Sequence, residues 1–214
     1  MIATPYLLYL GHSSDDIGIK TSRGLAVFRP DICVGEFRHD DCPLTLGLAR
    51  MDFAKAVRAG ARTLVLGIAN AGGTLGEDLI ADSIAAMEAG LDVASGLHSR
   101  LKDEPRLVET AARTGRILHD VRDPQPGIPV GNGRPRGGHR LLTVGTDCSV
   151  GKMYTTLCLA RAMERRGIAA DFRATGQTGI LIAGSGVPLD AVVADFISGA
   201  IEQIAPALSL IHIS

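Results

Sequence analysis

The chain has 214 residues, of which 46% are hydrophobic and 21% are charged, and its formal net charge is −1 at pH 7. A chain with so little net charge is not expected to present a large basic face, which argues against a nucleic-acid partner. No apolar run reaches the ~20 residues that cross a bilayer, and the first residues lack the basic region of a signal peptide. We therefore expect a cytoplasmic protein without a membrane partner.

The first part of the chain alternates short apolar runs with longer amphipathic segments. Buried strands are predicted where apolar runs end at glycine or polar turns, at residues 6–10, 32–34, 63–67, 91–94 and 117–119. Helices are predicted where apolar residues recur every three to four positions, at residues 46–59, 77–89 and 106–114. This alternation predicts an α/β fold with a mostly parallel sheet and helices on its faces.

A change of composition follows. Residues 122–139 read RDPQPGIPVGNGRPRGGH, a Pro/Gly-rich segment that predicts a linker or a long surface loop. Arg134, Arg136 and Arg140 could meet an acidic ligand, although a flexible basic linker explains them as well. Beyond it we predict strands at 141–144 and 170–174, helices at 152–166 and 189–204, and a glycine-rich loop at 175–186. Two strands and two helices cannot bury both faces of a sheet, so this second domain is expected to be incomplete.

The last seven residues, LSLIHIS, do not continue the preceding pattern. They resemble the translation of a transposon-end adapter used in sequencing libraries, so residues 208–214 are expected to be non-native. A natural apolar strand is the alternative. The expected organisation is a domain at 1–122, a linker at 123–139, a truncated domain at 140–207 and this tail.

The stretch LTVGTDCSVGKMYT, residues 142–155, has the features of a phosphate-binding loop between a strand and a helix. Glycines allow the backbone N–H groups to converge on an anion, the helix N-terminus adds partial positive charge, and the lysine adds a full one. A plain glycine-rich turn with a surface lysine is the alternative. The predicted phosphate-binding residues are Gly145, Thr146, Asp147, Cys148, Ser149, Val150, Gly151, Lys152 and Met153.

This loop departs from the common pattern in two ways. Five residues separate Gly145 from Gly151, one more than usual, and the longer spacing resembles the loop GTDTxVGKT of dethiobiotin synthetase. Met153 stands where a nucleotide-hydrolysing loop has a hydroxyl that ligates Mg²⁺, and a thioether cannot do this. Thr155 and Thr156 lie nearly a helical turn further on. We therefore predict no metal here, and a phosphate-bearing ligand such as coenzyme A, with a nucleotide as the alternative.

Other polar residues are candidates for the chemistry. Asp147, within the loop, could turn outward to a metal, an amine or a helix N-terminus. Gln177 and Thr178 could hydrogen-bond a substrate or only stabilise a local turn. Asp195 follows Val192 and Val193, and an acid on the apolar side of a helix could have a raised pKa and act as a general base toward an amine. The alternative places Asp195 on the polar edge of that helix.

The first domain offers weaker candidates. Residues 67–73, GIANAGG, follow a predicted strand at the place where open α/β sheets bind ligands, but they do not have the spacing of a dinucleotide motif. His12 and the segment 20–23 are expected in a polar loop after the first strand, where Lys20 and Arg23 could bind a dicarboxylic amino acid. A solvated loop is the alternative. The spacing of the four cysteines and six histidines predicts reduced thiols and no zinc site.

Three segments together are similar to one bacterial family: GTDCSVGKMYT, the run 174–202 and the run 11–25, GHSSDDIGIKTSRGL. That family was catalogued as a domain of unknown function, and its members include a D-glutamate N-acetyltransferase of D-amino-acid catabolism. The resemblance covers residues 1–207. It implies a Rossmann-like N-terminal domain, a P-loop-type C-terminal domain with Met after Gly-Lys as a family feature, and acetyl-CoA as the acyl donor. Members of the family are longer, which implies that the chain is truncated at its C-terminal end.

The resemblance implies acetylation of the amine of D-glutamate or a related D-amino acid. Two alternatives stay open: an ATP-dependent ligase or kinase of dethiobiotin-synthetase type, and a non-catalytic nucleotide-binding regulatory protein. A homo-oligomer is compatible with the sequence. A truncated polypeptide can be inactive, because exposed sheet edges and helix faces would lack their covering.

Overall fold

The computed structural model describes residues 2–69, 71–147, 150–205 and 211–213. The chain divides into two compact units, Met1–Val121 and Arg122–Ser214. Across the part of the chain that the structure describes, no helix combines the length and the apolar character needed to cross a membrane.

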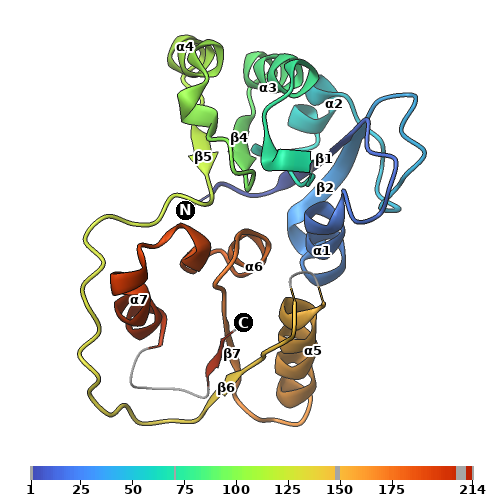
Figure 1. Ribbon diagram of the computed structural model, residues 1–214. Coiled ribbons are helices and arrows are strands. Elements are labelled where there is room, and N and C mark those ends of the chain that lie inside the picture. The colour runs from blue at the N-terminus through green and yellow to red at the C-terminus, as the bar shows by residue number, and fades with distance from the viewer. Residues whose placement is uncertain (1, 70, 148–149, 206–210, 214) are drawn as a thin grey trace. The chain divides into compact units, whose positions relative to one another are not determined.

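The first unit is built on a five-stranded parallel sheet with the strand order β2-β1-β3-β4-β5 (Figure 1). The strands are β1 (Tyr6–Gly11), β2 (Cys33–Arg38), β3 (Thr63–Leu66), β4 (Asp92–Ser95) and β5 (Leu118–Asp120). After β1 the chain pairs β2 on one side and then returns to place β3 on the other. Strand order therefore reverses between β1 and β3, and in open α/β sheets this reversal opens a ligand crevice at the carboxyl ends of the strands. The predicted parallel α/β fold is confirmed.

Helices connect these strands, as the alternating pattern predicted. They are α1 (Lys20–Phe28), α2 (Phe53–Arg58), α3 (Glu77–Ala89) and α4 (Pro105–Thr114), with short 3₁₀ turns at Pro30–Ile32, Ala71–Gly73 and Leu101–Asp103. α3 and α4 have nearly the bounds expected from their periodicity. Each ends at a glycine in the left-handed conformation, Gly90 with φ 108° and Gly115 with φ 67°, a common way to end a helix.

Two sequence expectations in this unit were wrong. The helix predicted at 46–59 begins only at Phe53, where the Asp52 carboxylate accepts from Lys55 N at 2.6 Å and caps it. The residues before it run beside β2 instead, since Ala49 O and Met51 N hydrogen-bond the backbone of Glu36. Residues 20–23, expected in a polar loop, form the first turn of α1.

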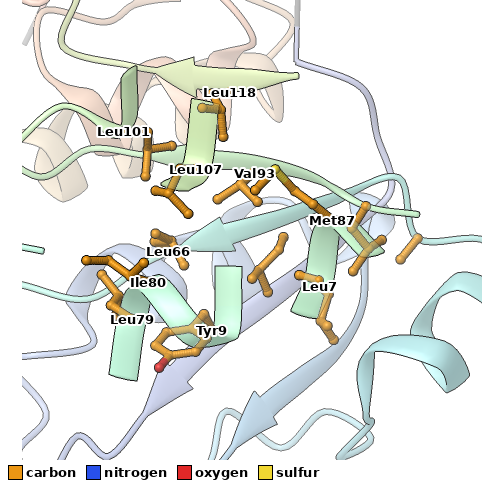
Figure 2. Close-up of a cluster of buried hydrophobic side chains, with 14 of the residues drawn as sticks. Leu7, Tyr9, Leu66, Leu79, Ile80, Met87, Val93, Leu101, Leu107 and Leu118 are labelled. Carbon is orange, nitrogen blue, oxygen red and sulfur yellow. The ribbon is translucent and has the colours of Figure 1, made fainter. Parts of the chain in front are cut away.

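The core of the first unit lies between the sheet and α2, α3 and α4. Figure 2 shows alternate side chains of the strands, among them Leu7, Tyr9, Leu66 and Val93, packed with side chains from the helices. This alternation follows from the period of two in a strand. All six residues of β1 are nevertheless buried, because helices and loops cover both faces of a parallel sheet.

The second unit contains a smaller parallel sheet with the order β6-β8-β7. Its strands are β6 (Arg140–Leu142), β7 (Asp171–Arg173) and β8 (Ile211–Ile213), and its helices are α5 (Lys152–Glu164), α6 (Gln177–Ala183) and α7 (Ile197–Ile204). β8 falls within the segment expected to be non-native, and the rest of that segment, 208–210 and 214, lies outside the described residues. The side chain of Leu142 in β6 is 63% exposed, so the described residues do not cover this sheet on both faces.

Two predictions made from the sequence of the second unit were wrong. The glycine-rich loop expected at 175–186 contains the helix α6, which ends at Gly184 with φ 76°. The helix expected at 189–204 begins only at Ile197 and is preceded by two 3₁₀ turns, Leu189–Ala191 and Ala194–Phe196. Val192 and Val193 between these turns have ψ values of 131° and 136°, an extended conformation that β-branched residues favour.

Part of the Pro/Gly-rich segment packs on α7. A side chain on Gly199 would come within 1.7 Å of Pro129 O, so the backbones of the two segments are in direct contact. The Glu202 carboxylate accepts from Asn132 N at 3.0 Å and from Gly133 N at 2.9 Å, and it pairs with Arg136 at 3.0 Å. The two backbone hydrogen bonds have the largest effect in holding the pKa of the Glu202 carboxyl below its usual value, and the hydrogen bond from Arg136 comes next.

Candidate functional site

The predicted phosphate-binding loop joins the end of β6 to the start of α5. Gly151 is the residue before the helix, and its φ of 96° is a left-handed conformation that glycine adopts without strain. As a glycine it has no side chain with which to cap the first amides of α5. Those N–H groups, together with the helix dipole, make this end of the helix suitable for an anion. Cys148 and Ser149 of the predicted site lie outside the described residues.

The side chain of Lys152 folds back over the loop. A Cβ on Gly145 would lie 3.2 Å from Lys152 Cγ and 2.8 Å from Val150 Cγ2, so only glycine allows the two ends of the loop to approach this closely. The ammonium group donates to the carbonyl oxygen of Asp147 at 2.5 Å. The positive charge is thus directed toward the backbone of the loop.

Two threonines follow Met153 in α5, one buried with a hydrogen-bonded hydroxyl and one exposed. Thr156 is fully buried, and its Oγ1 lies 2.7 Å from Thr143 Oγ1 and 2.9 Å from Lys152 O. Thr155 is exposed on the surface of α5. Within the described ranges, no group of three or more His, Cys, Asp or Glu side chains is arranged to hold a metal ion.

A second helix begins at the same edge of this sheet. Since β6 and β7 both run parallel to β8, the segments that follow them emerge at one edge, and α6 follows β7 as α5 follows β6. Gln177, a candidate from the sequence, is the first residue of α6 and is partly buried. Gly186 brings the chain back to β7, because a side chain there would meet Ala174 O at 2.5 Å. The parallel sheet thus places Gln177 and Lys152 on one edge.

Asp195 lies in the 3₁₀ turn Ala194–Phe196 and is exposed, as is its neighbour Val193. The helix expected here was wrong, so neither its apolar side nor its polar edge describes the position of Asp195. The hypothesis of a general base rested on burial, which this side chain does not have. Asp147 is also exposed at the surface of the loop.

The first unit holds the remaining candidates near the reversal of strand order. Lys20 and Arg23 lie in the first turns of α1, and Arg23 forms an ion pair with Asp16. The neighbouring Ser22 donates its backbone N–H to Gly67 O at 3.1 Å, and a Cβ on Gly67 would come within 1.9 Å of Ser22 Oγ. This close contact explains the glycine that opens the GIANAGG stretch. A role of Lys20 and Arg23 in binding a dicarboxylate stays a prediction.

Sequence reasoning missed a cluster at the carboxyl ends of β1 and β2. His12 and His39 stack on each other, and each has a carboxylate partner, Asp41 and Asp82. Of these residues only His12 was singled out from the sequence. His39 and Asp41 follow β2, which runs parallel to β1 and so ends at the same edge of the sheet as the strand before His12. Asp82 comes from α3, much further along the chain.

The two units together define the class of protein: a Rossmann-like α/β domain followed by a P-loop-type α/β domain. Two family models match the chain, the DUF1611_N Rossmann-like domain over residues 42–124 and the DUF1611_C P-loop domain over residues 129–212, both described as domains of unknown function. The chain belongs to the DUF1611 family, and the resemblance stated from its sequence is confirmed.

Relatives of known sequence or structure agree with this assignment. The chain is 52% identical to a D-glutamate N-acetyltransferase of Tritonibacter scottomollicae over 96% of this chain and 62% of the relative. It is 46% identical to a D-glutamate N-acetyltransferase of a Pseudoalteromonas species over 99% of this chain and 64% of the relative. The crystal structure of a DUF1611 family protein from Anabaena variabilis matches with a TM-score of 0.82 and 31% identity, over 98% of this chain and 65% of that one. The chain thus spans less than two thirds of the length of the curated relatives it matches.

Proposed function

We propose that the protein is an N-acetyltransferase that transfers the acetyl group of acetyl-CoA to the amine of D-glutamate or a related D-amino acid. The proposal is supported by the name that both curated relatives carry and by the geometry of the loop at 145–153. The observation that carries it is the position of Lys152, whose ammonium group faces the loop backbone while the next residue is Met153. Such a loop can hold phosphate groups without a magnesium ion bound beside the lysine.

The proposed reaction assigns a limited task to this loop. The pyrophosphate or the ribose phosphate of coenzyme A would lie against the first amides of α5, and Lys152 would neutralise part of its charge. Gln177, on the same edge of the sheet, would hydrogen-bond the acyl donor or the acceptor. The transfer also needs a deprotonated amine and stabilisation of the oxyanion formed at the thioester carbon.

The alternative is a nucleotide ligand, either in a ligase or kinase or in a regulatory protein without turnover. The spacing of the loop, which resembles that of dethiobiotin synthetase, favours this alternative. It requires a magnesium ligand other than residue 153, because a methionine thioether is a poor ligand for Mg²⁺.

Calorimetric titration of the full-length protein with acetyl-CoA and with Mg-ATP tests the proposal. We expect acetyl-CoA to bind without magnesium, and D-glutamate together with acetyl-CoA to release free thiol. Binding of Mg-ATP alone, or phosphate release that depends on magnesium and an amine substrate, would overturn the proposal in favour of the ligase. Nucleotide binding without any turnover would favour a regulatory protein.

A further inference from the structure

The cluster at the carboxyl ends of β1 and β2 is centred on the side chain of His39. This residue directly follows β2, and its backbone N–H donates to Gly11 O at the end of β1 at 3.0 Å. Its ring Nε2 lies 2.7 Å from Asp82 Oδ2 in α3. The same oxygen of Asp82 lies 2.6 Å from the hydroxyl of Tyr9, a core residue of β1 (Figure 2). Three elements of the first unit therefore meet at one carboxylate.

These contacts determine which nitrogen of His39 carries the proton. An ionised carboxylate only accepts hydrogen bonds, so the Tyr9 hydroxyl and His39 Nε2 must both donate to it. The pKa of Tyr9 is raised well above its ordinary value, mainly by burial and next by the hydrogen bond to Asp82. The hydroxyl therefore keeps its proton and remains a donor. With Nε2 protonated, Nδ1 is the ring nitrogen that can accept a proton. A carboxylate behind an imidazole also fixes the orientation of the ring.

Packing holds the ring of His39 on two sides. The ring of His12 stacks on it with centroids 3.9 Å apart and an interplanar angle of 4°, and Phe37 contacts it edge-on at 5.2 Å. The side chain of His39 is still 31% exposed, whereas that of Asp82 is only 14% exposed. His39 is thus accessible from outside, while Asp82 is largely shielded. This arrangement is typical of a carboxylate–histidine pair that transfers protons.

The second histidine has a similar arrangement nearer the surface. His12 Nδ1 lies 2.7 and 2.9 Å from the two oxygens of Asp41.

We propose that His39 is the general base that accepts a proton from the ammonium group of the amino-acid substrate, with Asp82 and Tyr9 as positioning residues. This inference rests on the proposed function and deepens it, because it names the group that takes the proton from the amine. The carboxylates of Asp41 and Asp82 give the cluster negative charge, which suits an ammonium ligand.

His39 Nδ1 takes one proton from the ammonium group, and the resulting imidazolium is stabilised by Asp82. The free amine attacks the thioester carbon of the acyl donor, so a C–N bond forms and the C–S bond breaks. The attacking nitrogen loses its second proton, the departing thiolate gains one, and His39 returns its proton to solvent.

The pH dependence of this step depends on the ionisable groups around the His39–Asp82 pair. α3 contributes Asp78 besides Asp82, and Asp40 directly follows His39. The remaining groups come from β1, from the end of β2 and from the loops that follow these strands: Tyr9, His12, Arg38, Asp41 and Cys42.

A His39→Gln substitution in the full-length protein tests the proposal. Glutamine keeps an N–H that can donate to Asp82 but removes the titrating nitrogen. We expect kcat/KM for D-glutamate to fall roughly 100- to 10,000-fold at neutral pH, the range typical of a lost general base. Activity should recover as the pH rises and the substrate amine deprotonates by itself, whereas the Kd for acetyl-CoA should not change. His139→Gln, in the exposed segment before β6, is the matched control and should behave as the wild type.

Two further measurements separate the possible failures. If the wild type acetylates D-glutamate and the His39→Gln variant keeps its kcat/KM and pH profile, this inference is overturned and the proposed function stands. If the wild type acetylates no D-amino acid, the proposed function fails, and ¹⁵N NMR of the histidine rings during a D-glutamate titration decides the subsite. A shift of the His39 Nδ1 resonance supports the amine site, and an unchanged resonance overturns it. Asp82→Asn should move the proton between the two ring nitrogens of His39 in the same spectra.

Discussion

The ammonium group of Lys152 lies 2.5 Å from the carbonyl oxygen of Asp147, five residues earlier in the same loop. The lysine therefore contacts the backbone of its own loop, and its side chain runs along Gly145 to reach that oxygen. A phosphate entering the loop would exchange a neutral acceptor for a charged one, and hydrogen bonds between charged partners are stronger.

Replacement of this lysine should weaken coenzyme binding. We expect Lys152→Ala to lose about 1.5–3 kcal/mol of binding free energy for acetyl-CoA, a factor of roughly 10 to 150 in Kd. Calorimetric titration at fixed ionic strength measures this loss. Arg166→Ala removes an exposed positive charge just beyond the other end of α5 and serves as the control. Equal affinities of the two variants would contradict a phosphate site in this loop.

Glu202 fastens the segment 129–136 to α7, and this contact should depend on pH. The folded-state pKa of Glu202 is lowered, so its stabilising effect is present above the ordinary pKa of a glutamate and is lost as the pH falls through the lower folded value. We expect hydrogen-exchange protection of the Asn132 and Gly133 amides to disappear in that acid range. Glu202→Gln should reduce this protection already at neutral pH, while Glu164→Gln at the exposed end of α5 should not. Equal protection in the two variants at neutral pH would show that the carboxylate does not hold this segment.

The parts of the fold that were predicted correctly have local causes. α3 and α4 carry an apolar period of three to four residues and end at glycines, so their signals lie within one short window of sequence. α1 gave no such signal, because Gly24 and the polar residues of its first turn obscure the buried Leu25 and Phe28. In α6 the glycines suggested a loop, although Gly179 is small in order to pack against Ala174, the residue after β7.

The candidate sites also differ in whether their residues lie within one short window of sequence. The loop that holds Lys152 is continuous in sequence, so its spacing alone suggested what it binds. The cluster around His39 joins Tyr9 to a carboxylate 73 positions away, and only the order of the strands brings the two together. Asp195 was misplaced for a related reason, because helix periodicity was extended across two valines whose backbone is extended.

The hydroxyl of Tyr9 should contribute measurably to the stability of the first unit. Tyr9→Phe removes one of the two donors to Asp82, so we expect the free energy of unfolding to fall by about 1.5–3 kcal/mol. Because burial raises the folded-state pKa of Tyr9, its contribution is fully present below the ordinary tyrosine value and is lost as the pH rises through the folded one. Urea unfolding of both proteins from pH 7 to pH 11 should show a steeper decline for the wild type above about pH 10. Parallel declines would contradict this assignment.

Cysteine reactivity gives an independent test of the packing in both units. Burial raises the pKa of the Cys33 thiol to about 11, whereas Cys158 is exposed on α5. Only the thiolate reacts with an alkylating agent, so at pH 8 Cys158 should react with iodoacetamide well before Cys33. Cys42 should also react slowly, because it is buried and its thiol donates to Ser13 O at 3.1 Å. Peptide mass spectrometry at successive times, in a Cys148→Ser background, measures the three rates separately. Equal rates for Cys33 and Cys158 in the native protein, with both accelerated alike by urea, would contradict the packing of β2 described above.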